Sequence, residues 1–134
     1  MRKRLLGAFA GIISLAIQGP AMAATEGMPQ WLIVLTLARP ELQDPKNWSD
    51  KDNAAVGAHF SRLQKMTDEG KVVFFGRTQD TTPDGHLVPD TTGLIVLEVP
   101  DRAAAEAVLR DDPAVTAGLM RGKVFSYKIA LQRK

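Results

Sequence analysis

The chain has 134 residues, of which 45% are apolar and 24% are charged, and it contains no cysteine. This composition is typical of one ordinary globular domain and excludes a disordered or fibrous chain. The lack of cysteine also excludes a disulfide framework and a zinc site built from thiolates.

The first 23 residues have the form of a secretory signal peptide. Arg2, Lys3 and Arg4 precede an apolar run over residues 5–17, and Ala21-Met22-Ala23 has the small residues of a cleavage site. A membrane anchor is the alternative, but the run is shorter than the roughly 20 residues that span a bilayer. We therefore predict a signal peptide over 1–23, a single domain over 24–134, a periplasmic or secreted location, and no stable membrane anchor after cleavage.

The net positive charge of the chain comes from this leader. The whole chain has 17 Lys and Arg against 15 Asp and Glu, which gives a net charge of +2. Without the three basic residues of the leader, 14 basic residues face 15 acidic ones, and the net charge is −1. A chain of this charge, with no cluster of basic residues, lacks the electrostatic footprint of nucleic-acid binding, so we expect no nucleic-acid partner.

The first half of the domain predicts a strand, a loop, a helix and a second strand. Residues 30–38 are apolar on both alternating faces, which indicates a buried strand, and the polar residues up to 50 with their two prolines predict a loop. Apolar residues then recur at helical spacing over 52–69, with Ser49 or Asp50 as the cap and Gly70 at the end. Residues 72–76 are β-branched and aromatic, as in a short strand.

The second half repeats this order after a turn-rich loop over 78–90. Residues 93–99 predict another strand that is apolar on both faces, and Asp101 is expected to cap a helix that runs to Arg110. Asp112-Pro113 ends this helix, because the residue before a proline is disfavoured in helical conformation. The buried stripe of the helix is predicted to be Ala104, Ala107 and Val108, and residues 123–131 predict the last strand.

The order strand, helix, strand, strand, helix, strand is that of an α+β, ferredoxin-like βαββαβ fold. Such a fold has a four-stranded antiparallel sheet with two helices on one face, and its first and third strands are central. These two strands are apolar on both faces, so a monomer would expose an apolar sheet face to water. We therefore expect a homodimer in which two sheets pack face to face, and a monomer with an open cleft is the alternative.

Several segments in the same order resemble the YCII-related domain family. They are the opening strand that runs into Arg39-Pro40, the helical His59-Phe60-Ser61-Arg62-Leu63, the stretch from Gly70 to Gly76, and residues 111–119 with Asp112-Pro113 and Ala117-Gly118. The resemblance covers about residues 30–130. It implies a ferredoxin-like dimeric α+β barrel and an activity of the lyase or isomerase type. It also implies a catalytic His and Asp, which fall on His59 and Asp112.

His59 lies at the margin of the apolar stripe of its helix, and Asp112 lies at the end of the second helix. If the two side chains meet, the carboxylate would accept one ring N–H and leave the other nitrogen free to act as a general base. The alternative is a histidine at the edge of the core that the aspartate holds for stability alone. Arg39, at the end of a central strand, could bind a substrate carboxylate through its guanidinium group, or be a solvated strand end.

The turn-rich loop holds one further pair, His86 and Asp84, which could serve as a second acid–base pair or as metal ligands. Two residues in a flexible turn make a poor metal site, so we expect a solvated loop there. The chain has no glycine-rich phosphate loop, Gly-x-Ser-x-Gly or His-Glu-x-x-His motif, and we expect neither a cofactor nor a metal. The sequence thus favours a small-molecule lyase or isomerase with His59, Asp112 and Arg39 in its site. The alternative is a non-catalytic ligand-binding or interaction module on the same fold.

Overall fold

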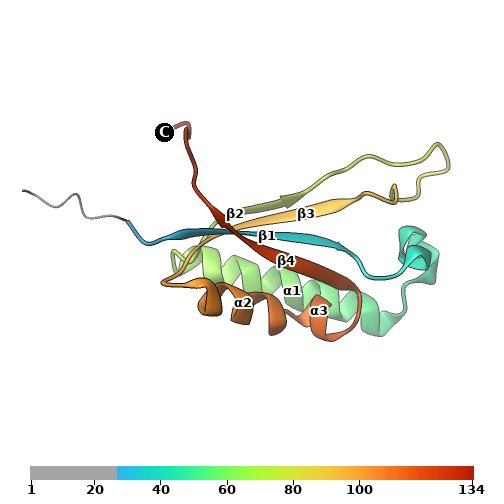
Figure 1. Ribbon diagram of the computed structural model, residues 1–134. Helices are drawn as coiled ribbons and strands as arrows, with labels where there is room; N and C mark the ends of the chain where they lie inside the picture. Colours follow the sequence, from blue (N-terminus) through green and yellow to red (C-terminus); the bar gives the residue numbers. More distant parts are fainter. Residues whose placement is uncertain (1–26) are drawn as a thin grey trace, which may run out of the picture.

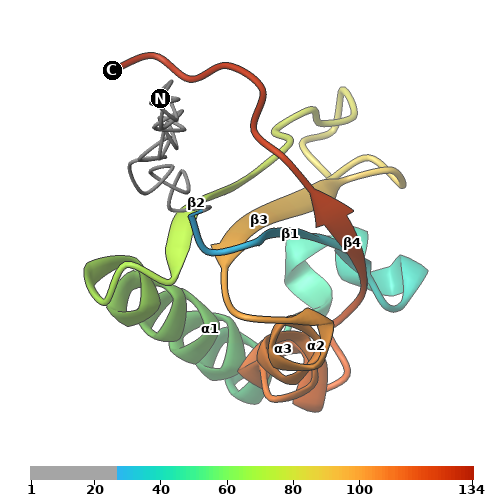
Figure 2. The same cartoon turned by 60° about the vertical axis from the view of Figure 1, so that its left-hand side comes forward.

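The computed structural model describes residues 27–134, and the predicted signal peptide over 1–23 lies outside them. Four antiparallel strands form one sheet in the order β2-β3-β1-β4. Their bounds are β1 (Gln30–Leu37), β2 (Val72–Arg77), β3 (Thr92–Glu98) and β4 (Met120–Tyr127). The helices α1 (Asp50–Asp68), α2 (Arg102–Arg110) and α3 (Pro113–Thr116) all lie on one face of the sheet (Figures 1 and 2). The predicted ferredoxin-like fold, with the first and third strands in the centre, is confirmed.

Helix α1 begins where a capping box forms. The Ser49 side chain accepts a hydrogen bond from the Asp52 backbone N–H, and the Asp52 carboxylate accepts one from the Ser49 backbone N–H. These two bonds satisfy donors that a helix start leaves unpaired, so the cap is Ser49 rather than Asp50. At the other end, Gly70 has φ +76°, a left-handed conformation that glycine adopts at little cost.

The segment between β1 and α1 differs from the predicted loop. It contains two short 3₁₀ helices, η1 (Pro40–Gln43) and η2 (Pro45–Asn47), and each begins with a proline. Proline suits the first turn of a helix, because its fixed φ is already helical and no N–H is needed there. Leu42 of η1 is buried and packs with Ala114 and Leu119, so this segment is part of the folded body.

The C-terminal part also differs in detail. Ala105 is the fully buried residue of α2, with Ala104, Val108 and Leu109 packed against the core, so the expectation for Ala107 was wrong. Strand β4 begins at Met120 instead of 123 and ends at Tyr127 instead of 131. It starts earlier because Gly118, with φ +75°, turns the chain after α3 and brings Met120 into register with Leu37.

The main core lies between the sheet and the helices. Ile33 and Leu35 of β1 and Ile95 and Leu97 of β3 point to this side and pack with Leu63 of α1. The opposite face of the sheet carries an apolar row across all four strands, formed by Phe74, Val96, Leu32 and Phe125. Among the described residues, no helix is long and apolar enough to cross a membrane.

Candidate active site

Asp112 occupies the short connection between α2 and α3. It is 2% exposed, and its Oδ1 accepts a hydrogen bond of 2.8 Å from the backbone N–H of Ala114, so it caps α3. The proline that follows fits the first position of that helix and keeps Asp112 extended. The local sequence therefore fixes the direction of this carboxylate before any contact with another element.

His59 extends from the middle of α1 toward the second oxygen of the same carboxylate. Its Nδ1 lies 2.7 Å from Asp112 Oδ2, and the two side chains are 12% and 3% exposed. A carboxylate can only accept, so Nδ1 is the donor and Nε2 carries the lone pair of the neutral ring. Within residues 27–134, no protein group hydrogen-bonds to Nε2. The structure thus brings the two predicted residues together and leaves one ring nitrogen unused.

Arg62 is a third member of this cluster and had no role among the predictions from the sequence. It lies one helical turn after His59, and one of its guanidinium nitrogens donates a 2.8 Å hydrogen bond to the carbonyl oxygen of Val108. The same nitrogen is 3.8 Å from Asp112 Oδ2. The spacing of three residues from His59 on one helix was a usable signal, because such residues share a face. Arg62 places a positive charge beside the carboxylate on the side away from Ala114.

His59 lines a pocket of about 500 Å³ between the sheet, α1 and the η2 segment. Most of the lining is apolar, and two of its aromatic rings, Phe60 and Phe75, meet edge to face with centroids 5.6 Å apart. Asp112 does not line this pocket; it holds His59 from behind. The other apolar lining residues include Leu35, Leu37, Trp48, Val56, Leu87, Ile95 and Met120. This arrangement places the His59 ring at the wall of a largely apolar cavity.

Arg39 does not reach the pocket. It precedes η1, where Pro40 turns the chain away at the end of β1, and it is not among the described residues that line the cavity. Its guanidinium lies 3.6 Å from the Glu41 carboxylate, and its side chain is about half exposed. The structure therefore places Arg39 as a solvated strand end, the alternative that the sequence had left open. The arginine that does line the pocket is Arg77, at the end of β2.

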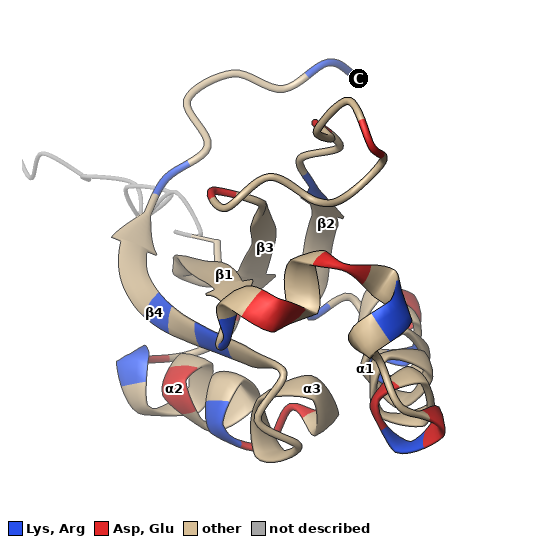
Figure 3. Cartoon of the chain, turned by 90° about the vertical axis from the view of Figure 1, so that its right-hand side faces the viewer, with Lys and Arg blue, Asp and Glu red and all other residues tan. Residues whose placement is uncertain are grey.

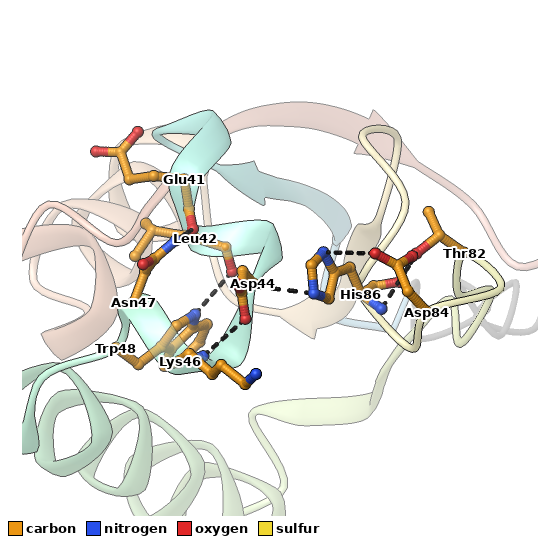
Figure 4. Close-up of polar contacts among 9 residues, drawn as sticks. All are labelled: Glu41, Leu42, Asp44, Lys46, Asn47, Trp48, Thr82, Asp84 and His86. Atoms are coloured by element: carbon orange, nitrogen blue, oxygen red, sulfur yellow. Dashed lines mark hydrogen bonds and ion pairs between the residues drawn. The ribbon is translucent and has the colours of Figure 1, made fainter.

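The loop that carries His86 is tied to the η1 and η2 segment, as Figure 4 shows. The imidazole lies between two carboxylates, 3.6 Å from Asp44 and 3.5 Å from Asp84, and the backbone N–H of Leu87 donates to the carbonyl of Gln43. A hydrogen bond from the Thr82 hydroxyl holds the pKa of Asp84 below its usual range. The loop is thus anchored rather than merely solvated. In the described part of the chain, no group of three or more His, Asp or Glu side chains could hold a metal ion.

The fold and the pocket define a class of protein: a ferredoxin-like α+β domain with a buried His–Asp pair at the wall of an apolar cavity. The YCII-related domain family matches residues 31–128, and the chain belongs to that family. A similar solved structure is 5-chloro-2-hydroxyhydroquinone dehydrochlorinase from Burkholderia phenoliruptrix in complex with 2,5-dihydroxybenzoquinone. It is 16% identical with a TM-score of 0.46, and the alignment covers 73% of this chain and 93% of that chain. No curated protein matches the chain.

Proposed function

We propose that the protein is a small-molecule lyase or isomerase in which Nε2 of His59 removes a proton from the substrate. One observation carries the proposal: the 2.7 Å contact between His59 Nδ1 and the buried Asp112 carboxylate, on a ring that lines an apolar pocket. The carboxylate fixes the tautomer and the direction of the ring. The geometry is that of a general base with its orienting group.

The chemistry follows from the same contacts. As Nε2 takes a proton from an acidic C–H or O–H of the substrate, the imidazole becomes positive, and the Asp112 carboxylate at 2.7 Å balances that charge. In an isomerisation, the proton returns to a different atom of the substrate. In an elimination, the electron pair of the broken bond forms a double bond, and a leaving group departs with its own pair. A positioned general base of this kind typically accelerates a reaction about 10²–10⁴-fold.

The test compares variants of the two histidines against a panel of small C–H and O–H acids. We expect His59→Gln to remain folded and to lose about 10²–10⁴-fold in turnover, because glutamine has no basic nitrogen. His86→Gln is the matched control and should keep full turnover, because His86 is not among the described residues lining the pocket. A folded His59→Gln protein with full turnover would refute the proposal. If ligands raise the melting temperature without being consumed, the binding-module alternative is supported instead.

We further propose that the protein is a homodimer through the uncovered face of the sheet. Phe74, Leu94, Phe125 and Tyr127 are each between 38% and 45% exposed there, which is unusual for large apolar side chains gathered on one face. The strand pairing places Arg121 and Lys123 of β4 on this face, and Figure 3 colours the basic residues of that strand blue. A two-fold contact would bring the same apolar row of each copy together. Light scattering should give twice the chain mass, and Phe125→Glu should give a monomer.

A further inference from the structure

Arg77 points toward the pocket because of its place in the sheet. It is paired with Gly93, and Gly93 is paired with Leu35, so these three residues form one row across β2, β3 and β1. Leu35 belongs to the main core, and Phe75, two residues before Arg77, also faces the helices. Side chains two apart on a strand share a face. Arg77 therefore lies on the face that carries the pocket.

The middle of this row has no side chain. A Cβ atom built on Gly93 would lie 3.3 Å from the Leu35 Cβ, so the row is closely packed on that side. Gly93 has no side chain and lines the pocket together with Arg77 and Leu35. Arg77 therefore borders the cavity with no β3 side chain between it and Leu35 in this row.

Among the described residues that line the pocket, Arg77 is the only one of the types Lys, Arg, Asp and Glu. In residues 27–134 it has no carboxylate within 4 Å, and its guanidinium makes only a long, 3.4 Å hydrogen bond to the carbonyl of the adjacent Thr78. Two other arginines of the domain, Arg62 and Arg102, have firmer partners. Arg62 donates at 2.8 Å to Val108, and Arg102 lies over the ring of Trp31. A positive charge at an apolar pocket, with most of its donors unused, is suited to an anionic group of a ligand.

We propose that the pocket binds small, largely apolar carboxylates, with Arg77 holding the carboxylate and the remainder of the ligand lying against the aromatic and aliphatic lining. The planar guanidinium fork matches the two oxygens of a carboxylate, which also orients the ligand. This inference rests on the proposed function for the reaction, because His59 would act on the part of the ligand away from its carboxylate. The preference for an anion is independent of that reaction and can be measured by binding alone.

The experiment uses benzoate and benzamide, which have the same shape and differ in charge. Binding to the protein over residues 24–134 is followed by isothermal titration calorimetry and by Trp fluorescence, since Trp48 lines the pocket. We expect wild-type protein to bind benzoate about tenfold more tightly than benzamide, and Arg77→Gln to abolish that preference. Arg77→Lys should keep part of it, because lysine retains the charge without the fork. Arg133→Gln is the matched control for net charge, and it should behave as wild type.

The outcomes separate this inference from the proposed function. Equal binding of the two probes to wild-type protein, or a preference that survives in Arg77→Gln, would overturn the role of Arg77 and leave the His59 chemistry standing. His59→Gln should keep the benzoate preference even though turnover is lost. If neither probe binds at millimolar concentration, the pocket is not a site for such ligands, and the inference is wrong. Benzoate preference with full turnover in His59→Gln would support Arg77 and refute the proposed base.

Discussion

Replacing Asp112 by alanine should remove two stabilising interactions at once, because its two oxygens serve different partners. Loss of the cap on α3 costs about 1 kcal/mol, and loss of a hydrogen bond to a charged group costs about 1.5–3 kcal/mol. The side chains of Asp112 and His59 are 3% and 12% exposed, so solvent screens the second interaction little. We expect Asp112→Ala to lower the free energy of unfolding by about 3 kcal/mol.

The contribution of the His59 contact is isolated by a double-mutant cycle with His59→Gln. Urea unfolding followed by Trp fluorescence gives the four free energies, and the coupling between the two changes should be about 1.5–3 kcal/mol. Asp101→Ala provides the control. Asp101 caps α2 in the same manner, with its carboxylate accepting from Ala104 at 2.8 Å, but its side chain has no histidine partner among the described residues.

The control should lose about 1 kcal/mol and be additive with His59→Gln. Coupling below about 0.5 kcal/mol between Asp112 and His59 would refute the contact as an energetic interaction. Equal coupling for Asp101 and Asp112 would show that the cycle reports a general loss of packing rather than the pair.

Two further predictions concern stability away from the pair. Gly122→Ala would place a Cβ 2.8 Å from Leu109 Cδ1 and 2.9 Å from the backbone oxygen of Val34. We expect it to lower the free energy of unfolding in urea by about 1–3 kcal/mol. Gly76→Ala, with open space at its Cβ, is the control and should leave that free energy nearly unchanged. Hydrogen bonds from the Ser49 backbone and side chain hold the pKa of Asp52 below its usual range. The pKa of Asp52 is lower in the folded protein than in the unfolded chain. The ionised Asp52 therefore stabilises the fold above the pKa of the unfolded chain, and this stabilisation is lost as pH falls through the pKa of the folded protein. The free energies of unfolding of wild type and Asp52→Asn should therefore differ more at about pH 6 than at about pH 2.5. The same difference at both pH values would contradict this prediction.

The order of strands and helices could be predicted because each element has its own local signal. Strands β1 and β3 are apolar on both faces, and α1 and α2 are capped by Ser49 and Asp101, whose side chains accept hydrogen bonds from the first turn. The 3₁₀ helices between β1 and α1 could not be predicted in the same way. They are stabilised by the burial of Leu42 against Ala114 and Leu119, more than 70 residues further along the chain, and no local pattern reports such a contact.

The positions of the site residues also depend partly on local sequence and partly on contacts between distant segments. Helical spacing places His59 at the margin of its apolar stripe, and Pro113 ends the second helix at Asp112, but neither signal brings the two residues together. Their pairing was expected from the resemblance to the YCII-related domain family. The two strand-end arginines could not be told apart. Arg39 lies just after β1, where Pro40 turns the chain into η1, whereas Arg77 ends β2 and its pairing with Gly93 leaves it beside the cavity. The register between strands determines which of the two arginines lies at the cavity, and this register could not be predicted from the sequence.

The structural and the catalytic interpretations of Asp112 involve different atoms of one carboxylate. Oδ1 accepts from Ala114 and caps α3, while Oδ2 accepts from His59 and lies near Arg62. Asp112→Asn can keep an oxygen for the cap but removes the negative charge that balances a protonated imidazole. A purely structural role predicts that Asn recovers the cap on α3, about 1 kcal/mol of the stability lost in the Ala variant, and leaves turnover unchanged. A role in orienting the base predicts the same recovery of stability with turnover still reduced, because the uncharged amide stabilises imidazolium poorly.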